Sequence, residues 1–323
     1  GSAGFGTGGS EGELEASFVR FNNLFSSSLL NVKAGKFELD LPFSEKRSPT
    51  LNTPFVMYHY AQGKGFNRVI ANPAGNPTFA NPNDFGMGDN QQGMEIFGWK
   101  DVDAVDGNFR YSLNAVSSSA SNVTGSGGGR SMQFYGHVTQ SFGGYGIVDG
   151  QRIGLFGMAG RTPTVGNEAI GTGSQTGTGG QSKTFNRVGV DFSLTALGTI
   201  NVFGAYMIAH DSKALFASQG IATAQEGRWN GGFVEADYNF TAPWVAYYRY
   251  DWIRNNFQGD ASFDKKFGNV DSHTIAARYH LMVSKRTAVA LHAELSNTRS
   301  YKTGTFGEDQ IANVAFVGAD LAF

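Results

Sequence analysis

The chain has 323 residues, a formal net charge of −2 and no cysteine; it contains 45 Gly, 27 Phe and 12 Tyr, while only 16% of its residues are charged. The near-neutral charge argues against a nucleic-acid partner, because neutralising phosphates requires a basic face. The lack of cysteine excludes disulfides, thiolate metal ligands and haem attachment through C-x-x-C-H within these residues.

The N-terminal residues carry no targeting segment. The chain opens Gly1-Ser2-Ala3-Gly4, without the basic and apolar regions of a secretory signal. We expect either that a signal was removed or that the chain begins within a longer protein. No stretch approaches the length of about 18 apolar residues that a transmembrane helix needs.

Segments in which apolar and polar residues alternate recur along the chain, and this period of two predicts β-strands. In Trp244–Ile253, for example, Tyr248 and Trp252 share a face with Trp244, while Arg249 and Asp251 share the other. We predict about thirteen strands, at residues 14–25, 30–41, 93–102, 107–118, 131–142, 151–162, 184–196, 199–211, 228–240, 243–254, 271–283, 286–299 and 311–323.

The two faces of these strands differ in a way that is typical of membrane barrels. Aromatic residues at both ends of an apolar face indicate a lipid-facing band between two interfaces. The predicted interface aromatics are Tyr238, Phe240, Trp244, Tyr250 and Trp252. The opposite face would line a wet lumen, with Arg110, Arg187, Asp191, Glu235, Asp237, Arg249, Asp251, Arg278, His280, His292 and Glu294.

Connections between the predicted strands alternate in length. Tight ones fall near 26–28, 103–106, 197–198, 241–242 and 284–285, and long ones near 42–92, 119–130, 163–183, 212–227, 255–270 and 300–310. Outer-membrane barrels combine short periplasmic turns with long extracellular loops. We therefore predict an all-β fold: an antiparallel transmembrane up-and-down β-barrel of about 14 (to 16) strands, with residues 1–323 as a single domain.

Strand parity predicts a strand that the chain lacks. If the C-terminus is periplasmic, counting back places the start of the 14–25 strand outside the cell, whereas barrels normally begin in the periplasm with an even strand number. We expect at least one strand or segment to precede Gly1. Alternatively Phe55–Tyr60 supplies the strand, which would make 62–92 a very long periplasmic turn.

The long connection 42–92 is predicted to be an extracellular loop or a loop folded into the lumen. Its apolar run Phe55–Tyr60 would be an extra strand or part of a plug. A diffusion porin narrows its pore with a charged inward-folded loop, and the charged candidates here are Glu45, Lys46, Arg47, Lys64 and Arg68.

The C-terminal residues Phe316–Phe323 resemble the signal that the barrel-assembly machinery reads in outer-membrane proteins. Gly318 is followed three residues later by apolar Leu321 and then by terminal Phe323, whereas Phe316 stands where the pattern usually has a polar residue. The resemblance implies location in a bacterial outer membrane, with its lipid and that machinery as partners.

A second resemblance covers about 35 residues. Ala16–Phe25 (ASFVRFNNLF) and Leu30–Thr50 (LNVKAGKFELDLPFSEKRSPT) are similar to the early barrel strands of proteins that place a haem-binding c-type cytochrome segment before a porin-like barrel. The resemblance implies haem c on a partner or on a preceding segment, since this chain contains no cofactor-attachment motif. The Gly35–Glu38 pattern also occurs in diffusion porins.

Two hairpins place charged residues opposite one another. If 271–299 pairs about a turn near Arg286, Arg278 faces Glu294 and His280 faces His292, close enough for an ion pair and for a shared metal or hydrogen bond. Polar lumen residues that bond to each other and to water are the alternative. In the preceding hairpin Glu235 faces Arg249, as an ion pair that stiffens the wall.

No catalytic motif is found, and we predict no enzyme, no catalytic residue and no metal centre. G-x-S-x-G and H-E-x-x-H are absent, and Gly4–Gly9 matches G-x-G-x-x-G without a strand before it or a helix after it. A hydrolase would need a Ser, a His and an acidic residue close together at the rim of the barrel. His210 and His273 are expected near that rim. Oxygen ligands for Ca²⁺ could come from Asn81, Asn83, Asp84 and Asp89, but their spacing is not that of an EF-hand. We interpret them as residues of surface turns.

Two functions remain open. The first is a porin-like conduit for small hydrophilic solutes, and the second is an insulating sheath for a c-type cytochrome in electron transfer across the outer membrane. Both use a closed sheet in which every backbone polar group is paired. An absorbance spectrum discriminates them, because the sheath requires a haem Soret band.

Overall fold

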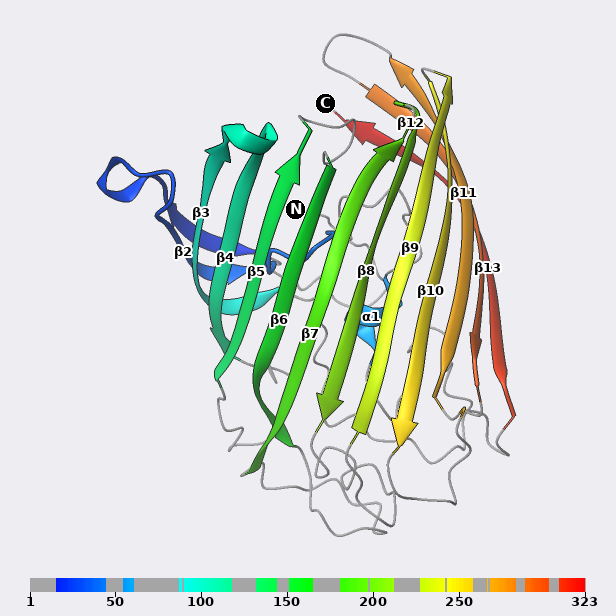
Figure 1. Ribbon diagram of the computed structural model, residues 1–323. Coiled ribbons are helices and arrows are strands. Elements are labelled where there is room, and N and C mark those ends of the chain that lie inside the picture. Colours follow the sequence, from blue (N-terminus) through cyan, green and yellow to red (C-terminus); the bar gives the residue numbers. More distant parts are fainter. Residues whose placement is uncertain are drawn as a thin grey trace, which may run out of the picture.

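The computed structural model describes residues 16–44, 55–60, 87–88, 90–117, 132–143, 151–164, 181–196, 198–211, 227–241, 243–257, 266, 268–282, 288–301 and 308–322. They form one antiparallel sheet of 13 strands, in which every strand pairs with the next one in sequence (Figure 1). The strands are β1 (Ser17–Phe21), β2 (Asn31–Phe37), β3 (Gln91–Val102), β4 (Gly107–Ser117), β5 (Met132–Phe142), β6 (Gln151–Thr164), β7 (Gln181–Ala196), β8 (Ile200–Asp211), β9 (Gly227–Thr241), β10 (Trp244–Phe257), β11 (Val270–Met282), β12 (Ala288–Ser300) and β13 (Gln310–Ala322).

Each predicted strand segment overlaps one of these strands, so the prediction of an all-β, up-and-down antiparallel fold is confirmed for the described residues. The 13 strands are close to the predicted number of about 14 (to 16), but not equal to it. The prediction succeeds because period-two alternation is a local property that each strand carries by itself.

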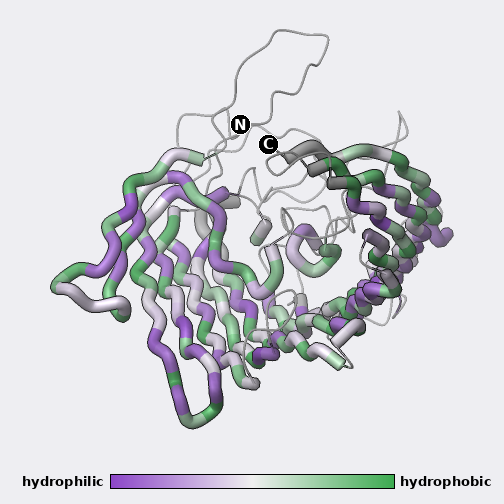
Figure 2. Tube along the Cα trace, turned by 90° about the horizontal axis from the view of Figure 1, so that it is seen from above, coloured by the Kyte–Doolittle hydropathy of each residue, from purple (hydrophilic) through white to green (hydrophobic). Residues whose placement is uncertain are grey.

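The long strands lie side by side and curve around an interior that contains the one-turn helix α1 (Val56–His59), as Figures 1 and 2 show. Curvature of this kind follows from the right-handed twist of adjacent strands. Tight turns join several pairs, including the 3-10 turns η1 (Leu24–Ser26) and η3 (Asp103–Val105). Gly198, between β7 and β8, has φ +67°, a conformation that glycine adopts without strain.

Side chains alternate between an inner face, toward α1, and an outer face, and the polarity is the reverse of that in a water-soluble sheet. On β12, Leu291 and Leu295 point outward and are 49% and 63% exposed, whereas His292 and Glu294 point inward and are each 2% exposed. The same reversal holds along β7, where Val188 and Val190 are exposed and Asp191 is buried. Among the described residues, no helix is long and apolar enough to cross a membrane.

Candidate functional site

The interior of the curved sheet holds two pieces of the connection between β2 and β3, residues 38–44 and 55–60, which we call the inner segment. Leu39, Phe43 and Phe55 are buried there, and α1 contacts β9 and β10. Because Phe55–Tyr60 is built around a helical turn, the extra-strand alternative is wrong. An apolar run this short can form a buried turn as readily as a strand, and periodicity does not distinguish the two.

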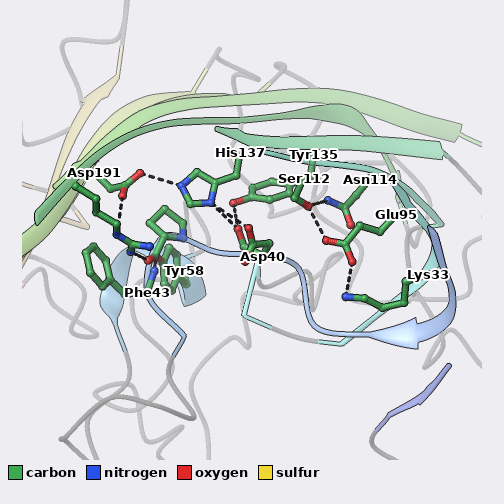
Figure 3. A network of polar contacts seen from close by, with 12 residues as sticks. Lys33, Asp40, Phe43, Tyr58, Glu95, Ser112, Asn114, Tyr135, His137 and Asp191 are labelled. Carbon is green, nitrogen blue, oxygen red and sulfur yellow. Dashed lines mark hydrogen bonds and ion pairs between the residues drawn. The ribbon is translucent and has the colours of Figure 1, made fainter. Parts of the chain in front are cut away.

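Residues 38–44 dock on the inner face through a histidine with two acceptors (Figure 3). Nδ1 of His137 lies 2.9 Å from the carbonyl oxygen of Asp40, which also accepts a hydrogen bond from the Tyr135 hydroxyl at 2.8 Å. Nε2 of His137 lies 3.0 Å from Oδ2 of Asp191. A carbonyl and a carboxylate can only accept, so both contacts are satisfied when both ring nitrogens carry protons. His137 is then an imidazolium between the segment and β7.

Arg152 of β6 holds the same piece of chain from a second side. Its guanidinium donates to the carbonyl oxygen of Pro42 and lies 4.7 Å from the centre of the Phe43 ring. Its Nε is 3.8 Å from Oδ1 of Asp191. One arginine therefore combines backbone, aromatic and ionic contacts, which positions the segment relative to both β6 and β7.

Aromatic contacts also attach the inner segment to β8 and β9. Phe43 packs against Phe203 and Phe233 with ring centres 4.7 and 5.6 Å apart, and Phe55 stacks on Phe233 at 4.1 Å. Phe233 is thus shared by both pieces of the inner segment. Such pairs contribute about 0.5–1.5 kcal/mol each beyond the burial of their area.

The far end of the inner segment is fixed by Tyr60. Its hydroxyl donates to the carbonyl oxygen of Gly268 at 2.9 Å and accepts from Nδ2 of Asn255 at 2.6 Å, while its ring lies edge-on to Trp229. Burial raises the pKa of the Tyr60 hydroxyl well above its ordinary value. The group stays protonated and able to donate at physiological pH.

A buried arginine, Arg249, connects the inner segment to charged residues of β9 and β10. Arg249 lies 2.8 Å from Oδ2 of Asp251 and 3.5 Å from Oε2 of Glu235, and its guanidinium stacks 4.6 Å from the Phe55 ring centre. The backbone N–H of Val56 donates to Oδ1 of Asp251 at 3.2 Å. Arg249 and Glu235 are register partners, so the predicted pairing is confirmed.

The predicted partners in the β11–β12 hairpin are wrong by two residues. Arg278 is the register partner of His292 and His280 that of Ala290, so Arg278 is not directly opposite Glu294, nor His280 directly opposite His292. The turn is centred one residue earlier than the sequence suggested. A shift of two residues keeps every side chain on its face, because strand side chains repeat every two residues.

His292 has other partners in place of His280. Its Nδ1 lies 3.1 Å from the Tyr247 hydroxyl, its Nε2 lies 3.2 Å from Oε2 of Glu294, and its ring contacts that of Phe316. Both ring nitrogens are therefore occupied within the wall. Among the described residues, no group of three His, Cys, Asp or Glu side chains is arranged to hold a metal ion.

The residues predicted to line a lumen occupy inner-face positions in the described strands. Arg187, Asp191, Glu235, Asp237, Arg249, Asp251, His292 and Glu294 are buried, Arg278 is half-buried, and Arg110 and His280 are exposed. Arg187 forms an ion pair with Asp211 at 2.7 Å, and the Trp229 indole donates to the same carboxylate at 3.1 Å. The structure thus distributes these residues over several clusters rather than one site.

The outer face carries two groups of aromatic side chains near opposite ends of the strands. Around the turn between β9 and β10, rings pack in the order Tyr238, Phe240, Trp244 and Tyr279, with centres 4.6–6.1 Å apart. Toward the other end of β10, Tyr250 stacks on Trp252 and His273, with centres 5.5 and 4.8 Å apart. All five predicted interface aromatics belong to these groups.

The proposed assembly signal lies on β13. Phe316 pairs with Glu294 and Gly318 pairs with His292. A Cβ atom at Gly318 would come within 2.7 Å of the Phe316 ring, so the glycine provides the space in which that ring lies. The backbone of Leu321 is in the strand, and Phe323 lies outside the described residues.

Other residues that the sequence singled out also lie outside the described residues. These are Glu45, Lys46, Arg47, Lys64 and Arg68, the oxygen-bearing Asn81, Asn83, Asp84 and Asp89, and the segments that would precede Gly1. Of the two rim histidines, His273 stacks on Tyr250 of the outer face, and His210 ends β8.

His137, Tyr135 and Arg152 are not among the site residues that the sequence predicts. Their signal was present, because Tyr135 and His137 alternate with Phe134 and Val138 within the predicted strand 131–142. Asp40 lies in the predicted strand 30–41, but β2 ends at Phe37, and the alternation of residues 37–41 did not indicate that this piece of chain docks inside the sheet.

No protein-family model matches this chain, and the comparison with curated proteins finds no match either.

Proposed function

We propose that this chain is an outer-membrane β-barrel that forms a transmembrane conduit for small hydrophilic solutes, narrowed by the inner segment. The observation that carries the proposal is the reversed polarity of the sheet. Exposed side chains on the outer face include Leu155, Val188, Ile208, Ile275 and Leu295, whereas the inner face buries charged residues. Water gives no reason to expose such a band, but lipid does.

The spacing of the two aromatic groups supports the same proposal. Trp244 and Trp252 lie eight residues apart on β10, which is about 27 Å along a strand at about 3.4 Å per residue. With the tilt of about 40° that barrel strands adopt, the vertical separation is about 20 Å, close to the apolar band of about 25 Å in outer-membrane barrels. The aromatic groups would then lie at the two membrane interfaces.

Closure of the sheet is part of the proposal. In a membrane an open edge would leave backbone groups unpaired at a cost of several kcal/mol each. β1 and β13 run in the same direction, because each strand is antiparallel to the next. Antiparallel closure would therefore take an odd number of further strands, in line with the even strand numbers of barrels.

The inner segment favours a narrowed conduit over a cytochrome sheath. It occupies the inner face from β5 to β10, where a sheath would need space for haem, and it is fixed there by contacts at both ends. A porin with an inward-folded connection needs this arrangement, and polar groups remain along the wall beside it.

Conductance across a planar lipid bilayer tests the function. We expect the purified chain to insert and to give discrete conductance steps of uniform size, because a water-filled barrel passes ions. Protein unfolded in urea before addition is the control and should give none. A folded chain that inserts without conductance steps would contradict the proposed conduit.

A further inference from the structure

A cavity of about 470 Å³ lies between the inner segment and the inner wall, within the size range of small-molecule sites. Its charged lining includes residues of separate elements: Lys33, Glu95 and Arg110 from β2, β3 and β4, and Arg152 and Asp237 from β6 and β9. The cavity is therefore bounded by the inner segment on one side and by the strands on the other. A passing solute would be in contact with both.

Two acidic groups of this cavity already have hydrogen-bond donors as partners. Glu95 forms an ion pair with Lys33 and accepts from the Ser112 hydroxyl at 2.7 Å. Glu38 accepts from the Ser44 hydroxyl at 2.8 Å. Glu95 and Glu38 are therefore committed to protein donors.

Arg110 differs from those carboxylates in its lack of a hydrogen-bond or ion-pair partner among the described residues. It lines the cavity and is exposed. Its influence on Asp40 is through charge alone. Burial by itself would raise the pKa of the Asp40 carboxyl, but the hydrogen bond and charge of His137, with the charges of Arg110 and Arg152, hold it below its ordinary value.

Around Asp40, cationic side chains outnumber carboxylates, because His137, Arg152 and Arg110 lie near Asp40 and Asp191. His137 and Arg152 are in contact with those carboxylates or with the inner segment, whereas the guanidinium of Arg110 makes no ion pair with a described residue. An arginine of this kind offers two parallel N–H donors to a carboxylate.

Aromatic rings line the same cavity beside Arg110. They include Phe18 and Phe37, which flank Lys33 with ring centres 5.5 and 4.6 Å from its ammonium nitrogen, and Phe97 and Trp99. The cavity thus combines the available guanidinium of Arg110 with apolar surface of the size of a benzene ring.

The geometry points to a binding site for small carboxylates with an apolar or aromatic body, held by Arg110 at the carboxylate and by the rings at the body. This inference rests on the proposed function, in which such anions would be a preferred class of solute. It names the solute class that the narrowed region selects.

Calorimetric binding of benzoate to the detergent-solubilised chain tests the site without requiring a conducting pore. We expect benzoate to bind and the neutral isostere benzamide to bind at least tenfold more weakly, since a charge-assisted hydrogen bond is worth about 1.5–3 kcal/mol. Equal binding of the two compounds, or no binding of benzoate, would overturn the inference. Benzoate binding by a chain that does not conduct would retain the site and reject the conduit.

Two variants locate the site. Arg110→Gln should weaken benzoate binding on the order of tenfold to a hundredfold, while leaving benzamide unchanged. Lys100→Gln removes the same charge from an exposed residue of β3 and is the matched control, for which we expect no change. Equal losses in the two variants would show that only net charge matters and would overturn the assignment to Arg110.

Discussion

Replacing residues 38–90 with a two-residue Asn-Gly turn should raise the single-channel conductance several-fold. Phe37 and Gln91 are register partners at the end of the β2–β3 ladder, so an Asn-Gly turn can connect them as a tight hairpin. The change removes the inner segment and leaves the strands in place. We expect a wider conduit, because the segment covers the inner face from β5 to β10.

A matched variant separates this effect from the shortening of any long connection. Asp211 and Gly227 are register partners of β8 and β9, so residues 212–226 can be replaced with the same Asn-Gly turn. The account predicts that the conductance rises in the first variant and stays near the original value in the second. Unchanged conductance in the first variant would show that the inner segment does not narrow the pore.

Arg249→Met should lower the free energy of unfolding by about 3–5 kcal/mol, the typical result of removing one partner from a buried ionic cluster. Arg249 is 1% exposed and lies between the carboxylates of Glu235 and Asp251, which are fully buried. Without the guanidinium, two negative charges would face each other in a region with little water. The measurement is urea unfolding of the chain in lipid vesicles.

Two further variants test the cause of that loss. Arg249→Met combined with Glu235→Gln and Asp251→Asn should recover most of the stability, because the charges left behind are removed. Arg254→Met is the control on the same strand: Arg254 is half-exposed and paired with Asp271 at 2.6 Å, and exposed pairs contribute about 0–1 kcal/mol. Equal losses for Arg249→Met and Arg254→Met would contradict the buried-cluster account.

The wall could be predicted from the sequence because each strand carries its own pattern. Alternation placed Arg249 and Glu235 on one face, and the tight turn at 241–242 set their register correctly. In the next hairpin the turn was placed one residue too far along, so the predicted register partners of Arg278 and His280 were wrong although their faces were right. Local pattern determines the face, whereas turn geometry determines the register.

The inner segment could not be predicted in the same way. Its contacts join residues far apart in sequence, such as Val56 and Asp251, which are 195 residues apart. Residues 38–41 continue the alternation that predicts a strand at 30–41, although β2 ends at Phe37, and Phe55–Tyr60 is short enough to suit a strand or a helical turn. Its position follows from rings and polar groups that the folded wall brings together, such as Phe233 and His137.

The central claim is that the outer face contacts lipid, and the stability of Leu295→Arg in a bilayer tests it most directly. Leu295 lies within β12, is 63% exposed and pairs with Ile275, which is exposed on the same face. Asn297→Arg, two residues further along this face, is the control for adding arginine where the surface is already polar. The account predicts that Leu295→Arg loses about 2–4 kcal/mol, as arginine does at the midplane of a barrel. A loss within about 0.5 kcal/mol, as at a water-exposed surface, would contradict it.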